Sequence, residues 1–419
     1  MDARGYRHIP TILFHWITFL TQALPVRSVP TFIELLVGAL LTPTGFVTQT
    51  WLVLDMKLHW TSYYKWLQTG KWSWVALAKQ MASLVIRWFP SGHWYLVIDD
   101  TVVLRSSRNA PDVKNHMLHG CKENRPQFVR GQGWVTLSVV VHSREKAYSI
   151  PLISRLSPTI GNRGNLRTAG LLLYVFKGFF SPATVLVDTW FMKGSFVHSI
   201  QKMGYQAIGQ VRSDLALFDP HIKKNKTGRP RKYGERYTAE AIEQLPEKRV
   251  EMMLYGKRQI IRYRTVVAQA RFLKGQVIRA VWVRMEDRYG RLKPARLLIA
   301  TNPELQALDI IQRYAKRWSI EPMFQQLKNA WGMKDTWQQS RQVLQRWVQI
   351  LSAGYALVRL LACHMESEDS AENWVQLTPW RKQTRLTAGL LRLHLLRSLS
   401  HLRVRDWWNA KSRKFYPPG

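Results

Sequence analysis

The order of apolar segments between residues 93 and 211 most constrains what this chain can fold into. Short runs rich in β-branched and aromatic residues, typical of strands, alternate there with longer runs of helical periodicity. In chain order the block reads as a strand at 93–101, a polar loop at 105–130, a β-hairpin at 133–143 and 146–156, a helix at 165–178, a strand at 183–188, a helix at 194–204 and a strand at 205–211. This order predicts an α/β sheet with helices packed on its faces.

Carboxylates stand where two of these strands are expected to stop. The segment VIDDT at 97–101 ends its apolar run at Asp99 and Asp100, and LVDTWF at 186–191 places Asp188 directly after another apolar run. In open α/β sheets the carboxyl ends of strands are where sites form. An aspartate at a strand end can also cap a turn or a helix, so these positions indicate a site only in combination with other residues.

The remaining chain divides around this α/β block. Alternating runs between residues 249 and 285 predict antiparallel strands, which interrupt the α/β pattern before it resumes. The segments before and after the block read as helical. We therefore predict a helical N-terminal domain at 1–88, an α/β domain at 89–213 and 291–365, a β-rich insertion domain at 214–290 and a basic helical region at 366–419.

The charge of the chain indicates a polyanionic partner. The sequence has 62 Lys and Arg against 27 Asp and Glu, a net charge of +35, which favours nucleic acid. Lys65 and Lys71, among aromatic residues that can also be core, make the helical domain at 1–88 a candidate DNA-binding domain. A membrane surface is the alternative for the basic C-terminal helix, but we find no membrane-spanning apolar run and expect a core helix at 9–25. Two cysteines, Cys121 and Cys363, suit a reducing cytoplasm.

Residues 314–328 supply a third carboxylate. Taken as one continuous helix at about 100° per residue, this segment places four polar side chains within a sector of roughly 60° on one face. They are Tyr314, Arg317, Glu321 and Lys328, with Trp318 beside them. A carboxylate among cationic groups is suited to holding a metal ion against a phosphate.

Asp99, Asp188 and Glu321 come from distant segments, as the ligands of a two-magnesium site often do. Mg²⁺ prefers carboxylate oxygens and keeps substrate phosphate in its coordination shell. Two such ions can hold the attacking and leaving oxygens of a phosphodiester displacement. The sequence has no glycine-rich P-loop, so we expect no nucleotide cofactor.

The spacing of Tyr314, Arg317, Glu321 and Lys328 resembles the Y-R-E-K signature of bacterial insertion-sequence transposases of the DDE type. The resemblance covers roughly residues 90–335 and includes ATN before the helix, WSIE and FQQLK within it, and both aspartate segments. It implies a ribonuclease-H-like catalytic domain interrupted by a β-strand insertion domain. It also implies a homodimer on the terminal inverted repeats of double-stranded DNA, cleavage with Mg²⁺ (or Mn²⁺) through a DNA hairpin, strand transfer into target DNA, and a place in the prokaryotic cytoplasm at the nucleoid.

The resemblance also implies the metal ligands. Asp188 and Glu321 fall on the second and third acids of the family. The first acid is Asp99 or Asp100, and only one of them can point at the metals because neighbouring strand residues face opposite sides of a sheet. The family pattern of Asp, any residue, then Thr or Ser favours Asp99, which is followed by Asp100 and Thr101.

The resemblance further implies which residues contact DNA. Tyr314, Arg317 and Lys328 are expected to contact phosphates near the cleaved end. Trp318 and Trp190 are candidates to stack on an unpaired base, with core packing as the alternative role of each. Two other functions compete with transposition: a nuclease of the same fold without strand transfer, and a transposase-derived DNA-binding protein that no longer cleaves.

Overall fold

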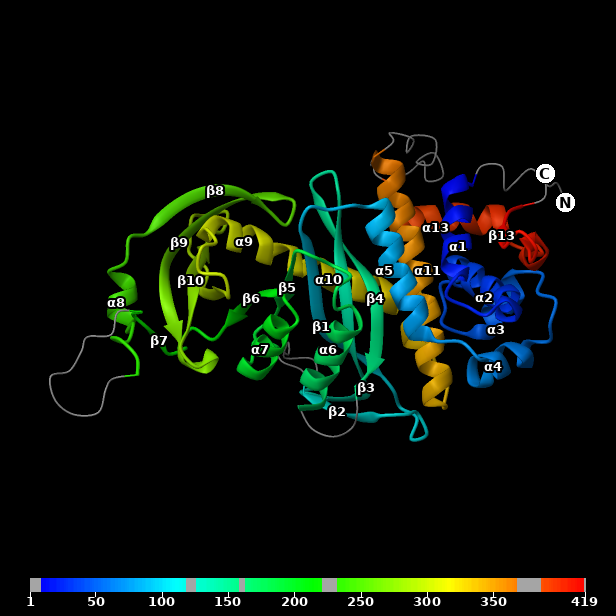
Figure 1. The fold of residues 1–419 in the computed structure, drawn as a ribbon, viewed down its shortest axis with the longest axis horizontal. Helices are drawn as coiled ribbons and strands as arrows, with labels where there is room; N and C mark the ends of the chain where they lie inside the picture. Colours follow the sequence, from blue (N-terminus) through cyan, green and yellow to red (C-terminus); the bar gives the residue numbers. More distant parts are fainter. Residues whose placement is uncertain (1–8, 118–125, 158–162, 221–231, 368–385, 418–419) are drawn as a thin grey trace.

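One mixed sheet of eleven strands runs through the protein (Figure 1). The structure, a computed structural model, describes residues 9–117, 126–157, 163–220, 232–367 and 386–417. The strands are β1 (Trp94–Leu104), β2 (Val113–Met117), β3 (Phe128–Ser143), β4 (Lys146–Leu156), β5 (Ala183–Val187), β6 (Gln206–Val211), β7 (Leu217–Phe218), β8 (Lys248–Leu254), β9 (Lys257–Ala270), β10 (Gln276–Met285) and β11 (Arg296–Ala300). Their order is β2-β3-β1-β5-β6-β11-β10-β9-β7, with β4 paired to β3 and β8 to β9.

The predicted α/β block is confirmed, with two corrections. Asp99 and Asp100 do not end their strand, because β1 continues to Leu104 along its antiparallel partner β3. Only the parallel pairing of β1 with β5 stops before them, at Val97. The expected loop at 105–130 contains the strand β2 and the first residues of β3; β2 is a polar strand at the edge of the sheet, so its sequence lacks the apolar run of a buried strand.

The predicted antiparallel strands of the insertion are β8, β9 and β10. They continue the sheet of the α/β block, because β11 pairs with β10 on one side and with β6 on the other. In Figure 1 they curve around the end of the sheet opposite the N-terminal helices. The residues predicted as an insertion domain therefore share a hydrogen-bonded sheet with the α/β block.

Helices cover the sheet and build the other end of the protein (Figure 1). They are α1 (Thr11–Thr21), η2 (Val26–Ser28), α2 (Val29–Leu41), α3 (Val47–Val53), α4 (Trp60–Thr69), α5 (Trp74–Trp88), α6 (Arg163–Val175), α7 (Gly194–Lys202), α8 (Ala239–Glu243), η3 (Arg271–Leu273), α9 (Ala307–Ala315), η4 (Lys316–Ser319), α10 (Ile320–Asn329), η5 (Met333–Asp335), α11 (Arg341–Ser367), α13 (Ala388–Leu399) and η6 (Val404–Trp407). A short hairpin of β12 (Trp408–Asn409) and β13 (Lys414–Phe415) follows.

The N-terminal helices and the C-terminal region pack together. Buried Glu34 of α2 accepts hydrogen bonds from the Tyr63 hydroxyl at 3.0 Å and from Arg405 Nη1 at 2.8 Å. The segment expected as a core helix is α1, which lies in the hydrophobic core. Cys363 is buried in α11, whereas Cys121 lies outside the described residues.

Helix α11 joins the helical end to the sheet. It packs against α2 on one side and β4 on the other, and Gln349 Nε2 donates to the Leu152 carbonyl at 2.8 Å. The helix is long and apolar enough to cross a membrane, but 94% of its most apolar window is buried inside the protein. Its composition is therefore that of a central core helix.

The predicted continuous helix at 314–328 is wrong in one respect. The chain runs from α9 through the 3₁₀ turn η4 into a new helix, α10. Pro322 explains the break, because a proline lacks the N–H for an intrahelical bond and is tolerated only in the first turn, where α10 places it. The polar residues remain together because η4 preserves the direction of the chain (Figure 1).

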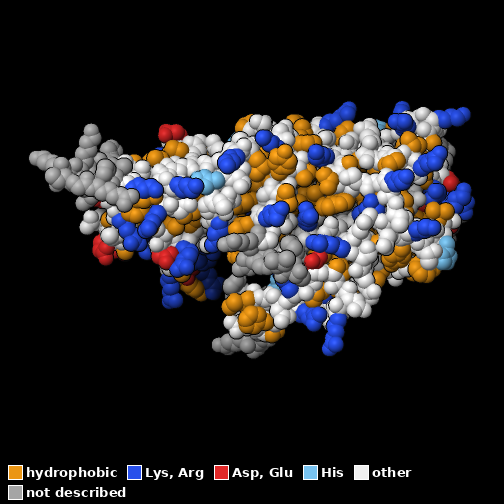
Figure 2. Space-filling model, turned by 60° about the horizontal axis from the view of Figure 1, so that its bottom comes forward, with side chains coloured by type: hydrophobic (Ala, Val, Ile, Leu, Met, Phe, Trp, Pro, Cys, Tyr) orange, Lys and Arg blue, Asp and Glu red, His pale blue; other side chains and the backbone are white. Residues whose placement is uncertain are grey.

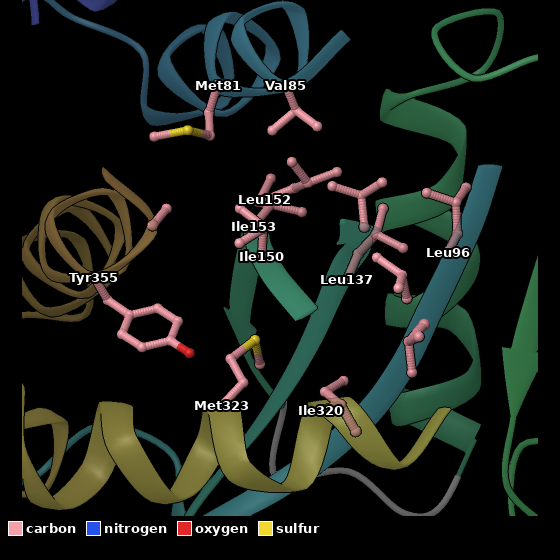
Figure 3. Close-up of a cluster of buried hydrophobic side chains, with 14 of the residues drawn as sticks. Met81, Val85, Leu96, Leu137, Ile150, Leu152, Ile153, Ile320, Met323 and Tyr355 are labelled. Atoms are coloured by element: carbon pink, nitrogen blue, oxygen red, sulfur yellow. The ribbon is translucent and has the colours of Figure 1, made fainter. Parts of the chain in front are cut away.

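Two kinds of contact hold α10 on the sheet. In Figure 3, Ile320 and Met323 point from α10 into a buried cluster with Tyr355 of α11 and side chains of β4. At the other end of the helix, the guanidinium of Arg105, which is 2% exposed, binds residues of the η5 turn. It donates to the carbonyls of Met333 and Thr336, to Thr336 Oγ1, and through Nε to Gln132 Oε1 at 3.0 Å.

Arg105→Met should therefore destabilise the protein. The apolar replacement leaves several buried carbonyl oxygens without donors, which costs about 2–4 kcal/mol of the free energy of unfolding. Arg108→Met, at an exposed arginine three residues away, is the matched control. Denaturant unfolding monitored by circular dichroism measures both variants, and equal stabilities would show that Arg105 does not hold the turn.

Candidate active site

Strand register brings the first two carboxylates together. The parallel pairing of β1 and β5 ends with Val97 opposite Leu186. Two residues further on, the same register reaches Asp99 and Asp188, and neighbouring strands lie roughly 4.8 Å apart. Asp188 is the first residue after β5, as predicted, and its Oδ1 also accepts the Phe191 N–H at 3.0 Å. Asp188 therefore caps a turn and faces Asp99 as well.

Alternation separates Asp99 from Asp100. Asp99 Oδ2 accepts a hydrogen bond of 2.8 Å from Arg317 Nη1, on the side of the sheet where η4 and α10 lie. Asp100 Oδ2 accepts one of 3.0 Å from Asn165 Nδ2 of α6. Of the two aspartates, Asp99 is therefore the one linked to the segment that carries Glu321.

Arg317 joins the first and third acids. Its Nη2 donates to Glu321 Oε1 at 2.8 Å while Nη1 binds Asp99, so one guanidinium lies between two carboxylates. Arg317 and Asp99 are nearly buried, with side chains 14% and 15% exposed, whereas Glu321 is 49% exposed. The ring of Tyr314 lies 5.9 Å from the guanidinium. The structure thus brings together all four of these residues.

The other predicted DNA contacts lie around this group. Lys328 Nζ donates to Thr101 Oγ1 at 2.9 Å, on the same face of β1 as Asp99. Trp318 is 47% exposed and packs edge-on against Tyr255 in the β8–β9 turn, with ring centroids 6.0 Å apart. Trp190 is partly buried and packs against Phe191, in agreement with the core alternative.

Burial and the nearby charge of Asp188 raise the pKa values of the neighbouring carboxylates. Burial, then the charge of Asp188, raises the pKa of Asp99 to about 7, although Arg317 opposes the shift. Desolvation and Asp188 also raise the pKa of Asp100 to about 6. Burial raises the pKa of Tyr314 to about 12. For Arg317, burial lowers the pKa, but its neighbours outweigh burial and raise it overall, so the guanidinium stays charged.

The residues fit a hard divalent cation. Carboxylate oxygens are the ligands that Mg²⁺ prefers, and the raised pKa values show that a positive charge beside Asp99 and Asp188 would relieve their repulsion. Within the described residues, no three His, Cys, Asp or Glu side chains are grouped closely enough to hold an ion. Glu321 can join such a site only if the Arg317 guanidinium leaves the space between the acids.

Two residues of this arrangement, Asn165 and Tyr255, were not predicted, and Thr101 was named only for its place after Asp99. The bond from Asn165 to Asp100 and the bond from Lys328 to Thr101 join distant segments, which no short motif encodes. Tyr255 reaches Trp318 because the β8–β9 turn extends to η4. The sequence signal for this turn was the Tyr255-Gly256 pair between two predicted strands. In the structure Tyr255 has a positive φ of 56°.

Asp99→Asn should change how stability depends on pH. The folded state holds this proton up to about pH 7, whereas the ordinary pKa is 3.8. The folded state therefore binds more protons between pH 4 and pH 7, and this carboxyl lowers the free energy of unfolding as the pH rises through that window. Relative to wild type, the variant should gain roughly 1–3 kcal/mol from pH 4 to pH 8.

Denaturant unfolding in EDTA over this pH range measures the effect. Glu304→Gln, at an exposed acid between β11 and α9, is the control and should leave the pH dependence unchanged. A stability difference between Asp99→Asn and wild type that is the same at every pH would contradict the crowding of Asp99 and Asp188.

Comparison with known proteins agrees with this geometry. A family model described as a transposase DDE domain matches residues 130–353, more than half of the chain. A second, described as a DDE superfamily endonuclease, matches residues 30–158, which include Asp99 and Asp100. No curated protein matches the chain, and membership of the Y-R-E-K subgroup stays a prediction. The chain belongs to the DDE transposase family.

Proposed function

We propose that this protein cleaves phosphodiester bonds at transposon ends, in a Mg²⁺-dependent reaction, and transfers the freed strands into target DNA. The observation that carries the proposal is the meeting of Asp99 and Asp188 by strand register, with Glu321 linked to Asp99 through Arg317. Figure 2 shows Lys and Arg side chains spread over one face of the protein among few acids, which suits a DNA substrate. The DDE family supports the same substrate class.

Asp99, Asp188 and Glu321 would hold the ions, with Mn²⁺ as a substitute. When bound, a pair of such ions stabilises the attacking and leaving oxygens of an in-line displacement. The chain supplies the remaining charge: Lys328, fixed by Thr101, and Arg317 can each neutralise phosphate oxygens. Trp318 remains an exposed candidate for stacking on an unpaired base.

Arg317 has two possible sets of partners in this reaction. A guanidinium binds carboxylates and phosphates with the same planar donor geometry. In the DNA-free protein it binds Asp99 and Glu321. An arriving DNA phosphate offers it an equivalent partner, and its departure frees both carboxylates for metal. DNA binding and metal binding would then promote each other.

Several finer expectations belong to this proposal. They are a homodimer on terminal inverted repeats, a DNA hairpin intermediate, DNA binding by the helical domain at 1–88, and association with the nucleoid in the cytoplasm. Incubation of the protein with Mg²⁺ and DNA from the ends flanking its gene tests the reaction. Hairpin-ended or joined products support transposition, nicks alone would indicate a nuclease without strand transfer, and intact DNA would indicate a protein that only binds.

Glu321→Gln should abolish cleavage and leave DNA affinity within about threefold of wild type, because the amide keeps the shape but loses the charge that binds metal. Gel analysis of the products and fluorescence anisotropy of labelled transposon ends measure the two properties. Glu304→Gln is the control and should cleave normally. If Glu321→Gln loses DNA binding, the metal-ligand role is wrong.

Arg317→Met should separate metal binding from DNA binding. Without the guanidinium, the DNA-free protein should bind Mn²⁺ more tightly, by roughly tenfold, because the carboxylates lose their internal cation. Its affinity for DNA should fall together with the steepness of the salt dependence. Titration calorimetry with Mn²⁺ and anisotropy in increasing salt measure these effects.

The matched control is Arg212→Met, which removes an exposed arginine paired with Asp214 at 2.8 Å. It should change neither the affinity for Mn²⁺ nor the site-specific cleavage. An unchanged or weaker affinity of Arg317→Met for Mn²⁺ would show that Arg317 does not compete with metal.

A further inference from the structure

A second group of cations lies on the same face of β1, away from the acids. Lys316 of η4 lies over the ring of Tyr95 at 5.2 Å, and its Nζ donates to His142 Nε2 at 2.9 Å. His142 is at the end of β3, with its ring 6.4 Å from that of Tyr95. The ring of His93 lies 5.1 Å from that of Tyr95. Arg313 of α9 is close enough to lower the pKa of Lys316 and of His93, in each case after burial.

This cluster has little negative charge to balance it. In the part of the chain that the structure describes, neither Lys316 nor Arg313 forms an ion pair with a carboxylate. Lys316 instead donates to an imidazole, and burial followed by the charge of Lys316 lowers the pKa of His142 to about 4. Among the described residues, Asp309 is the acid whose charge acts on Tyr95. Cations held together in this way repel one another, and a bound anion would relieve the repulsion.

The residues of the cluster are accessible and oriented. Lys316 and Arg313 are half-buried, so their charged ends can reach a ligand in solvent, and the uncharged imidazole of His142 is exposed beside Lys316. The ring of Tyr95 holds the Lys316 ammonium in place through a cation–π contact. His93 Nε2 is hydrogen-bonded to Thr184 Oγ1 at 2.8 Å, which fixes its ring beside the cluster.

The position of the cluster suits a nucleic-acid strand that passes the candidate active site. Tyr95 and Asp99 point to the same side of β1 and are four residues apart, a separation of roughly 13 Å along a strand. One strand of duplex DNA carries a phosphate about every 3.4 Å of helix axis. Because the phosphates of a winding strand are further apart than this axial rise, Lys316 lies about two to four nucleotides from a phosphate held at Asp99. Lys328 lies beyond Asp99 in the other direction.

We propose that Lys316, Arg313 and His142 bind a backbone phosphate of the DNA, about two to four nucleotides from the bond that is cleaved. This inference rests on the proposed function, because the spacing is measured from the candidate catalytic acids. The phosphate contact would lie near the start of β1. It would position the DNA strand without recognising any base.

The experiment uses duplexes of the transposon end in which one phosphate at a time is replaced by an uncharged methylphosphonate. With the wild-type protein, a methylphosphonate at one position about two to four nucleotides from the cleavage site should weaken binding about tenfold, the size of one charge-assisted contact. Lys316→Met should weaken binding to the unmodified duplex by the same factor. The methylphosphonate at that position should not weaken the binding of Lys316→Met any further, because this variant already lacks the contact.

Lys414→Met is the matched control, since exposed Lys414 also lies over an aromatic ring, that of Tyr416 at 6.0 Å, outside the domain proposed to bind DNA. It should retain the full effect of the methylphosphonate. Lys316→Arg should restore binding at that position, and Arg313→Met should reproduce the position-specific loss, which a general loss of folding would not do.

The outcomes separate this inference from the function on which it rests. Wild-type protein that neither binds nor cleaves the transposon end would contradict the proposed function. Wild-type binding and cleavage, with a Lys316→Met loss that is the same on every modified duplex or is absent, would overturn the second phosphate site and leave the proposed function intact.

Discussion

The parallel register between β1 and β5 is the constraint on which the candidate site depends. It places Asp188 beside Asp99 at the spacing of neighbouring strands, where two carboxylates repel and are partly desolvated. The remaining structure supplies the compensating charge. Arg317 reaches Asp99 only because α10 is held on the sheet, by its apolar face and by Arg105 at the turn beyond it.

Much of the fold could be predicted because its signals are local. Apolar runs and alternation identified the α/β order, the β3–β4 hairpin and the strands of the insertion. The errors occurred where local signals are weak or conflict. The edge strand β2 has no apolar run, and β1 passes through Asp99 and Asp100 because pairing with β3 outweighs two charged residues. Pro322 indicated the break before α10. The helical periodicity of residues 314–328, taken alone, predicted one continuous helix instead.

The site could be predicted as a set of residues but not as an arrangement. Asp188, Glu321 and the basic residues near Glu321 were found from strand ends and spacing. Which of the adjacent aspartates faces Glu321 depends on the register of strands far apart in the chain. The contact of Asn165 with Asp100 and the approach of the β8–β9 turn to Trp318 also depend on segments far apart in the chain. Such long-range pairings are decided by the packing of the whole sheet, which no single segment encodes.

The rise in the pKa of Asp99 has a consequence for the proposed reaction. A chain of net charge +35 should favour ionised carboxylates everywhere, yet burial and Asp188 raise this pKa to about 7. Burial and the charge of Asp188 together therefore outweigh what the overall charge and Arg317 relieve. A cation bound between the acids would offset the repulsive part of this cost, which would contribute to its binding free energy. If DNA draws Arg317 away, the gain grows, and by thermodynamic reciprocity bound metal must strengthen DNA binding by the same factor.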